Sequence, residues 1–562
     1  MSEPLEFDTI IIGAGSAGCL LANRLSAQRG QRILLVEAGG EDDWFWIKIP
    51  VGYLFTIANP RTDWCFKTQP DQGLAGRSIH YARGRGLGGS SSINAMIYMR
   101  GQSYDYERWA QITGDERWHW AGEHGQTLSI YKHLENYFAG ANEWHGTAGE
   151  IRVETPRVKW KILDAWQQAA REQGIPSIEE FNRGNNEGCA YFHVNQRSGR
   201  RWSMADAFLH PVRHRENLSV FTHTQTLQVL FEENRERRPS DQFAWANAGL
   251  RARGVRLLKD SQIIEARARK EVILSAGAIG SPHILQASGI GDPKHLGQFY
   301  IPVQQDLPGV GQNLQDHLQI RTIYKIKNAR TVNGLYANPF SRIGMALQYG
   351  LFRRGPMTMP PSTLGAFTKS DPLQPSANLE WHVQPLSLPK FGEPLHEFDA
   401  ITPSVCNLRP SSRGQVLLQH SDPLQAPAIH CNYLSTQEDL DVAVKGIAMT
   451  RDIMKSEALA GYNPEELFPG PQKVSQQELE QAARELGTTI FHPVGTCAMG
   501  RVSEEGASEN PLTVIDTSFR LRGVAGLRVV DASAMPTITS GNTNAPVMLM
   551  AERAARDILS PR

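Results

Sequence analysis

Several features that often reveal a protein's compartment are missing from this sequence. The N-terminal segment MSEPLEFD is acidic and lacks the basic and apolar regions of a signal peptide. No uninterrupted apolar run reaches the length of about eighteen residues that suits a transmembrane helix. The six cysteines show no C-x-x-C spacing, which gives neither a zinc site nor a disulfide framework; they are Cys19, Cys65, Cys189, Cys406, Cys431 and Cys497. We therefore expect a protein of a reducing compartment, located in the cytoplasm.

The sequence also has no excess of charge of either sign. Lys plus Arg and Asp plus Glu are both 58, so the formal net charge is zero. This balance gives no electrostatic reason to expect binding to nucleic acid. With 562 residues and 40% hydrophobic content, the chain is too long for one ordinary core. We expect two or three globular domains whose segments interleave.

The first clear pattern is strand, glycine turn, helix and second strand over Phe7 to Gly39. Thr9 to Ile12 is a short apolar run rich in β-branched residues, which is typical of a strand buried on both faces. The helix that follows is expected to end at Gly30. Ile33 to Val36 forms a second apolar strand, and Glu37 stands at its end.

The glycines of this unit indicate a dinucleotide site. Gly13 permits the tight turn, Gly15 lets the backbone approach a pyrophosphate, and Gly18 lets helix and strand pack closely. The helix N-terminus offers free N–H groups to the phosphates. Glu37 can accept hydrogen bonds from ribose hydroxyls, which favours NAD or FAD over NADP without separating the first two. The alternative is a structural βαβ unit that is merely rich in glycine.

Two further segments allow more than one interpretation. GRGLGGSSSINAMIYMRG, Gly84 to Gly101, has few Cβ atoms and can bring backbone N–H groups against a ligand, but a tight internal turn fits it equally well. Residues 40–80 are aromatic without a clear period. They suit a lid or contact surface, or a loop that packs its aromatic rings into the core.

Taken together, the motifs resemble those of the glucose–methanol–choline (GMC) flavoprotein oxidoreductases. Gly84 to Gly101 is similar to the first family signature, and GAIGSPHILQASGIG, Gly277 to Gly291, to the second. LPGVGQNLQDH (Leu307 to His317) and GLRVVDASAMPTITSGNTNAP (Gly526 to Pro546) also match, in the family's order. The resemblance covers the whole chain and is strongest to choline dehydrogenase-like bacterial alcohol dehydrogenases.

The resemblance implies a Rossmann-like α/β FAD-binding domain interleaved with an α+β substrate domain built on an antiparallel sheet. We expect the FAD-binding domain to comprise residues 1–160, 201–321 and 486–562. The substrate domain is expected to comprise residues 161–200 and 322–485, with its sheet roofing the flavin.

The implied catalytic residue is His492, in the stretch FHPVGTCAMG. On the residues alone, an isolated histidine is more often structural. In the family, the histidine of H-x-x-G-T lies beside the flavin and pairs with a His or Asn that follows a P-T dipeptide. Here Pro536-Thr537 leads to Asn542, which we prefer on spacing over its neighbour Asn544. His492 is then the base that takes the alcohol proton, and Asn542 holds the alcohol oxygen.

The implied cofactor is FAD, bound without a covalent link. Family members that attach FAD use a histidine of the first signature, and the matching position here is Ile93. A strand over Leu218 to Phe231 is expected to bring the backbone near Thr226 to the adenine. No metal site is predicted. The FAD-binding residues carried over from the motifs are Gly13, Gly15, Ser16, Ala17, Gly18, Glu37, Ala38, Arg85, Gly88, Gly89, Asn94, Ala95, Met96, Thr226, Asp531, Ala532, Asn542 and Thr543.

Phe491 and Gln319 are the predicted substrate-pocket residues. Choline-oxidising members tend to carry an acid shortly after the D-H of the L-Q-D-H motif, which suits a quaternary ammonium. In this sequence Asp316-His317 is followed by Leu318 and then Gln319. A neutral glutamine favours an uncharged primary alcohol, aliphatic or aromatic.

The predicted function is FAD-dependent oxidation of a primary alcohol to the aldehyde by hydride transfer to flavin N5. Electrons would pass to a quinone-type acceptor or to O2. Choline dehydrogenase and alcohol oxidase are the alternatives within this class, and a FAD-containing hydroxynitrile-type lyase belongs to another. The fingerprint taken alone also allows an NAD-linked dehydrogenase.

An amphipathic helix with basic ends is expected over Ser341 to Arg354. A helix of the core or of a subunit interface is the first interpretation. A role at a membrane surface or in a substrate channel is the alternative. The second interpretation corresponds to weak peripheral association with the inner face of the membrane. The motifs predict no particular oligomeric state.

Overall fold

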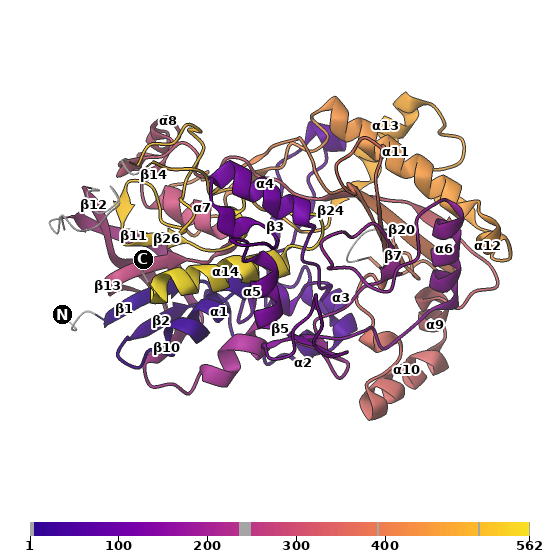
Figure 1. Cartoon of the computed structure of the whole chain (residues 1–562), viewed down its shortest axis with the longest axis horizontal. Helices are drawn as coiled ribbons and strands as arrows, with labels where there is room; N and C mark the ends of the chain where they lie inside the picture. The colour runs from indigo at the N-terminus through magenta and orange to yellow at the C-terminus, as the bar shows by residue number, and fades with distance from the viewer. Residues whose placement is uncertain (1–4, 235–248, 390–392, 504–505, 561–562) are drawn as a thin grey trace.

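The computed structural model describes residues 5–234, 249–389, 393–503 and 506–560, and two large sheets organise it (Figure 1). The first sheet has eight strands, and β25 (Val524–Ala525) and β26 (Leu527–Val529) join it through β12 and β13. The other strands, in spatial order, are β10 (Leu218–Phe221), β2 (Ile33–Val36), β1 (Leu5–Ile12), β13 (Gln262–Leu274), β12 (Leu250–Lys259) and β11 (Thr224–Glu233). The strands from β10 to β13 run parallel, which confirms the predicted Rossmann-like unit.

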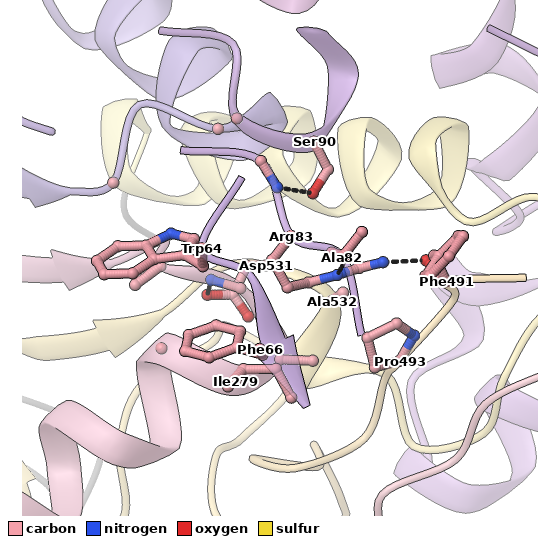
Figure 2. Close-up of a pocket in the computed structure, with 18 of the residues that line it drawn as sticks. Trp64, Phe66, Ala82, Arg83, Ser90, Ile279, Phe491, Pro493, Asp531 and Ala532 are labelled. Carbon is pink, nitrogen blue, oxygen red and sulfur yellow. Dashed lines mark hydrogen bonds between the residues drawn. The ribbon is translucent and has the colours of Figure 1, made fainter. Parts of the chain in front are cut away.

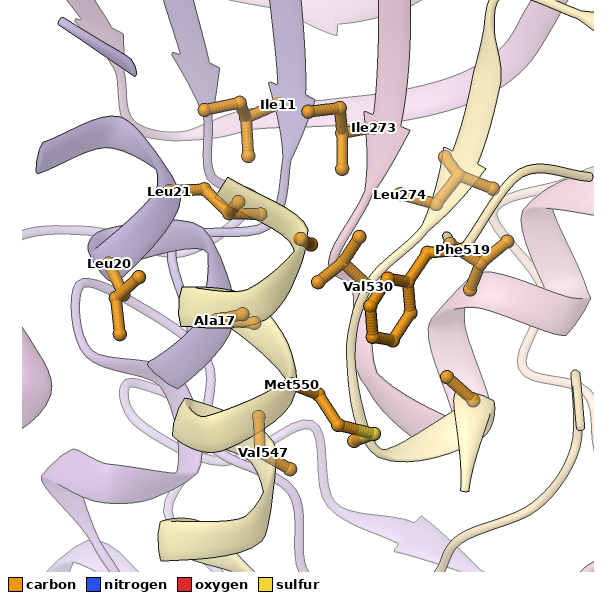
Figure 3. Packing of buried hydrophobic residues seen from close by; sticks show 14 of the residues in the cluster. Ile11, Ala17, Leu20, Leu21, Ile273, Leu274, Phe519, Val530, Val547 and Met550 are labelled. Carbon is orange, nitrogen blue, oxygen red and sulfur yellow. The ribbon is translucent and has the colours of Figure 1, made fainter. Parts of the chain in front are cut away.

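Two helices cover one face of this sheet. The glycine-turn helix α1 (Ser16–Leu25) packs against the C-terminal helix α14 (Asn544–Leu559), and both bury their apolar residues against β1 and β13 (Figure 3). Ile10 and Ile11 of β1 are fully buried, as expected for a strand covered on both faces. The first and the last long helices of the chain therefore lie side by side, next to the glycine turn of the fingerprint.

The helix α1 ends at Leu25, so the expected end at Gly30 is wrong. The backbone N–H of Ser26 still donates to Ala22 O, but the chain then turns toward β2. Asn217 holds this turn, since its Nδ2 lies 2.9–3.1 Å from three carbonyl oxygens, those of Ser26, Gln28 and Gln31. The partner that stops the helix is distant in sequence.

The strand expected over Leu218 to Phe231 is two strands at opposite edges of the sheet. His223, with φ of 51°, breaks the run. β10 then pairs with β2, whereas β11 pairs with β12. Between them the chain crosses the end of β2, where His223 N donates to Gly39 O at 2.8 Å and Thr224 N donates to Glu37 O at 2.9 Å.

Neighbouring strands of the second sheet run antiparallel to each other, as predicted for the substrate domain. Helices α6 (Lys161–Glu172), α11 (Gln437–Met454) and α13 (Gln476–Leu486) share its apolar core. Its strands are β23 (Glu465–Phe468), β17 (Ile323–Lys325), β20 (Ala400–Asn407), β19 (Leu379–Gln384), β18 (Leu364–Thr368) and β7 (Gly188–Tyr191), with β16 (Leu318–Arg321) paired to β20 and β24 (Gly487–Thr489) paired to β16. β16 precedes residue 322 and β24 follows residue 485, so this sheet extends beyond both expected boundaries. The domain division itself stays a prediction.

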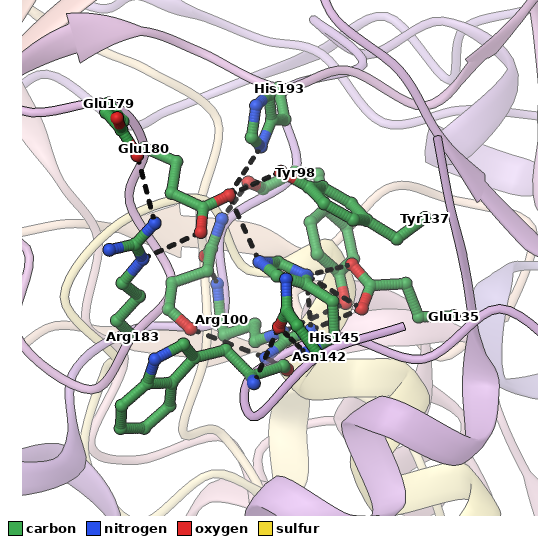
Figure 4. Close-up of polar contacts among 12 residues, drawn as sticks. Tyr98, Arg100, Glu135, Tyr137, Asn142, His145, Glu179, Glu180, Arg183 and His193 are labelled. Atoms are coloured by element: carbon green, nitrogen blue, oxygen red, sulfur yellow. Dashed lines mark hydrogen bonds and ion pairs between the residues drawn. The ribbon is translucent and has the colours of Figure 1, made fainter. Parts of the chain in front are cut away.

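A buried polar cluster anchors the end of the first signature (Figure 4). Arg100 Nη2 donates to Glu135 Oε2 at 2.6 Å, and both side chains are fully buried. His145 Nδ1 lies 3.0 Å from both Glu135 oxygens, and its ring stacks on Tyr137. Because a buried charge without a partner is costly, this network fixes where the signature segment leaves the cavity.

The aromatic segment 40–80 has some rings packed in the core and others exposed on the surface. Its helices α2 (Phe45–Lys48) and α3 (Tyr53–Thr56) and its strand β3 (Phe66–Lys67) are short. Tyr53 is buried, whereas Phe45 and Phe55 are exposed.

The amphipathic helix exists as α10 (Pro339–Phe352), but its placement in the core is wrong. Tyr349 is the one residue of the helix that is buried, and the helix lies on the surface at the lower right of Figure 1. Among the described residues, no helix combines the length and the apolar character needed to cross a bilayer.

Candidate active site

One cavity of about 460 Å³ connects the fingerprint to the antiparallel sheet. Its wall includes residues from both halves of the chain, such as Gly13 at one end and Gln319 and His492 at the other. Most of the predicted FAD-binding residues line it: Gly13, Gly15, Ser16, Ala17, Glu37, Ala38, Gly89, Asn94, Ala95, Met96, Thr226, Asp531, Ala532, Asn542 and Thr543. The predicted pocket residues Phe491 and Gln319 line it too.

The glycines at the fingerprint end hold bare backbone around the cavity. Gly13 has φ of +97°, and a Cβ there would lie 2.6 Å from Ser275 O. A Cβ on Gly89 would lie 2.8 Å from Gly15 Cα, so the first signature packs directly on the fingerprint. Gly15 itself has open space toward the cavity. A wall of this kind fits a pyrophosphate that must approach backbone N–H groups closely.

The cavity wall does not include Gly18, Arg85 or Gly88. The structure therefore gives no support to their predicted contact with the cofactor. A Cβ on Gly18 would lie 1.9 Å from Gly13 O, which confirms its packing role. Gly88 N donates to Ala14 O at 2.8 Å and supports the turn from behind. The guanidinium of Arg85 lies over the ring of Trp64, 5.3 Å from its centroid.

The carboxylate of Glu37 is engaged by the protein itself. Oε2 accepts from Ala14 N at 2.9 Å, and Oε1 accepts from Gly39 N at 2.8 Å and Gly86 N at 3.0 Å. Burial raises the pKa of Glu37, while these three donors oppose that shift. Glu37 thus ties the fingerprint, the end of β2 and the first signature together at the cavity wall. Its contact with a ribose stays a prediction.

Asp531 is a second buried carboxylate of the cavity wall that joins separate motifs through hydrogen bonds. Its carboxylate accepts from Gly277 N at 2.9 Å, Ser281 Oγ at 2.6 Å and Ser533 N at 2.8 Å. The second signature and the C-terminal motif are therefore joined through one buried acid. Figure 2 shows Asp531 and Ala532 in the wall beside Ile279.

An aromatic pair forms a side of the cavity that sequence reasoning did not identify. The rings of Trp64 and Phe66 stack with centroids 5.7 Å apart, and both face the cavity beside Arg83 (Figure 2). Arg83 Nη2 donates to the carbonyl of Phe491. Phe491 has φ of 66°, a conformation that is strained for a bulky residue and points to a functional constraint.

The structure brings His492 and Asn542 together. Asn542 Nδ2 lies 3.1 Å from His492 Nε2, and both residues line the cavity. The alternative residue, Asn544, instead accepts a hydrogen bond from Ser16 Oγ at 2.6 Å at the start of α1. The geometry therefore favours Asn542 over Asn544 as the partner of His492.

A second histidine fixes the tautomer of His492. His317 Nε2 lies 3.2 Å from Leu408 O, a carbonyl that can only accept, so Nε2 carries the proton. Burial lowers the pKa of His317, which keeps the ring neutral and leaves Nδ1 as an acceptor. His492 Nδ1 is 3.0 Å from that atom and must donate to it. His492 Nε2 then carries a lone pair, which accepts from Asn542 Nδ2 at 3.1 Å in the cavity wall.

The pKa of His492 is well below its usual value of 6.5. Burial is the main cause, and nearby His382 and Arg83 add to it. His492 is therefore neutral at neutral pH, which is the form that can accept a proton.

Asp316 positions His492 through the backbone. Its Oδ1 accepts from His492 N at 2.8 Å. Its Oδ2 accepts from Thr489 Oγ1 at 2.6 Å, Tyr81 OH at 3.0 Å and Tyr433 OH. The L-Q-D-H motif thus supplies two supports for His492, Asp316 and His317. Sequence reasoning missed both, although the motif itself was the signal.

Comparison with known proteins identifies the family. The family model described as GMC oxidoreductase matches residues 7–319 with its N-terminal part and residues 410–551 with its C-terminal part. An alcohol dehydrogenase [acceptor] of Pseudomonas putida is 38% identical over 98% of this chain and 96% of its own length. Oxygen-dependent choline dehydrogenase 1 of Chromohalobacter salexigens is 36% identical over 100% of this chain and 97% of its own.

Solved structures show the same fold. The crystal structure of pyridoxine 4-oxidase from Mesorbium loti has a TM-score of 0.85 at 30% identity and covers 98% of this chain and 99% of that one. A formate oxidase structure has a TM-score of 0.87 at 23% identity, with 99% of each chain covered. The first signature, the cavity residues and these relatives agree, and the chain is an FAD-binding alcohol oxidoreductase that belongs to the GMC oxidoreductase family.

Proposed function

We propose that the protein oxidises an uncharged primary alcohol, aliphatic or aromatic, to the aldehyde, with His492 as base and Asn542 as its partner. The observation that carries this proposal is the chain of contacts from Leu408 O through His317 and His492 to Asn542. It leaves the Nε2 lone pair of His492 facing the cavity, where an alcohol oxygen can donate its proton.

The residues divide the work between proton removal and orientation. An alcohol is a weak acid, so a base must lie within hydrogen-bond reach of its oxygen. His492 is that base, and the amide of Asn542 holds the same oxygen without having to reorganise during the reaction. Bound FAD supplies the two-electron acceptor for the α-hydrogen. The residues that hold FAD in this proposal are those of the fingerprint, the first signature and the C-terminal motif named above.

The cavity wall supports an uncharged substrate. Glu37 and Asp531 are the carboxylates of its described lining, and backbone or serine donors engage both. Gln319, buried on β16, is neutral and donates to Thr489 O at 3.4 Å. A quaternary ammonium would meet no free carboxylate among these described residues.

Choline is the second candidate substrate, because Trp64 and Phe66 place aromatic rings in the cavity wall, where a cation can contact them. The likeness to choline dehydrogenases also supports it. The two candidates separate in steady-state kinetics. A kcat/KM for choline above those for benzyl alcohol and hexanol would replace the first proposal by the second.

The experiment is anaerobic stopped-flow reduction of the bound flavin by an alcohol panel, followed by reoxidation with air or a quinone analogue. In the wild type, primary alcohols should reduce the flavin and remove the absorbance of its oxidised form. In a hydroxynitrile-type lyase they would not. His492→Ala should retain FAD and slow reduction by about two to four orders of magnitude. Reduction at the wild-type rate in that variant would exclude His492 as the base. The faster reoxidant then identifies the acceptor as O2 or a quinone.

A further inference from the structure

Helix α10 presents an apolar stripe to solvent. Its residues recur at spacings of three and four, which places them on one face of the helix. In a monomer such a face normally packs on the core, yet here the side chains stay largely exposed. They are Phe340 at 84%, Ile343 at 59%, Leu347 at 59% and Leu351 at 72%, with Phe352 at 65% at the C-terminal end.

The sequence segment that carries this stripe is cationic, although the chain as a whole is neutral. The sequence contains no Asp or Glu from residue 317 to residue 370. Over the same stretch five basic residues are exposed, and they flank or belong to the helix: Lys327, Arg330, Arg342, Arg353 and Arg354.

Further cations border the C-terminal end of α10. The hairpin of β8 (Gln196–Arg197) and β9 (Arg200–Arg201) touches it, where Tyr349 OH donates to Gly199 O at 3.2 Å. Arg197 and Arg200 of this hairpin are exposed. Arg157 Nη1 donates to Arg353 O at 3.0 Å and adds another cation.

A second group of exposed apolar side chains lies beside the same hairpin. Helix α2 contacts β9, and α3 follows it in the chain. Phe45 is 57% exposed, and Phe55, at 45%, stacks its ring on Trp46 with centroids 4.0 Å apart. Helices α2, α3 and α10 lie along the lower side of Figure 1.

We propose that α10 docks in the headgroup region of an anionic lipid bilayer. Its apolar stripe would enter the acyl boundary, and the arginines around it would meet the lipid phosphates. The helix has 14 residues, too few to cross a bilayer, so it lies in the surface plane. A second copy of the chain is the competing occupant. A two-fold interface would set these same arginines against each other, and like charges make that contact unfavourable.

Docking at α10 would bring the cavity close to the bilayer. The chain runs from α10 through the short 3-10 turn η8 (Pro356–Thr358) to Pro361 and Ser362, and both of these residues line the cavity. Docking itself does not depend on the proposed substrate, because it can be measured without turnover.

The test is co-sedimentation of the FAD-loaded protein with vesicles. We expect binding to vesicles of phosphatidylcholine and phosphatidylglycerol in equal parts, weak binding to phosphatidylcholine alone, and loss of binding at high salt. A triple variant, Ile343→Ser, Leu347→Ser and Leu351→Ser, should weaken binding at least about tenfold. Arg342→Gln with Arg354→Gln should also weaken binding, and chiefly to the anionic vesicles.

A matched control carries three exposed apolar residues elsewhere, Ile263→Ser, Tyr300→Ser and Val474→Ser. It should bind vesicles as the wild type does. Turnover of a water-soluble alcohol with a soluble dye acceptor should be unchanged in all these variants, which shows that they fold. Absence of binding to anionic vesicles at low salt would overturn the proposal, as would equal loss in the control. A dimer in sedimentation velocity that the triple variant dissociates, without vesicle binding, would assign the face to a second copy.

Discussion

The contact between His317 and His492 yields the sharpest prediction, because it separates tautomer control from general stability. His317→Leu removes the acceptor for the Nδ1–H of His492, 3.0 Å away, and leaves the carbonyl of Leu408 without its donor. The Nε2–H tautomer of His492 then becomes accessible. In that form Nε2 carries a proton and cannot accept one from an alcohol.

The size of the effect follows from the burial of the pair. His317 is fully buried, and loss of a hydrogen bond by a buried polar group costs about 1–3 kcal/mol. If that energy selects the tautomer, the rate of flavin reduction falls about ten- to a hundredfold. His317→Asn is the matched variant, since its amide oxygen can accept from His492 Nδ1. It should recover most of the rate.

The assay is anaerobic stopped-flow reduction at saturating alcohol, recorded across pH. Since His317 accepts from the Nδ1–H of His492 and so favours the protonated ring, its loss in His317→Leu should also move the acid limb of the rate profile to lower pH. A purely structural role would lower Tm in both variants without shifting that limb. Reduction by His317→Leu at the wild-type rate would refute the tautomer argument.

Three further predictions follow from the same cavity. In Asn542→Asp a carboxylate would lie beside His492 Nε2 and raise its pKa, so alcohol turnover should fall; a near-normal kcat would contradict the pairing. In Glu37→Gln an amide would face three backbone N–H groups, which should cost about 1–3 kcal/mol and release FAD on gel filtration, whereas full retention would contradict that role. In the wild type, the depressed pKa of His492 keeps it neutral above its folded value, so kcat/KM should stay level down to pH 6.5 and fall only below it; an inflection at or above pH 6.5 would contradict the shift.

The sequence by itself determined features that depend on neighbouring residues. The close fit of Gly18 on Gly13 O is required by the local path from β1 into α1, so the glycine pattern was sufficient to predict it. The antiparallel sheet and the presence of α10 followed from the family motifs and from helical periodicity. His492 and Asn542 could be named because each belongs to a recognisable motif.

Tertiary structure alone decided the features that rest on distant partners. Helix α1 stops at Leu25 because Asn217 holds the turn, and the guanidinium of Arg85 turns to Trp64 rather than to the cavity. His317 and His492 are 175 positions apart, so no local pattern shows that one sets the tautomer of the other. The periodicity of α10 predicted its apolar stripe, but only the packing of the folded chain left that stripe facing solvent, because no described element covers it.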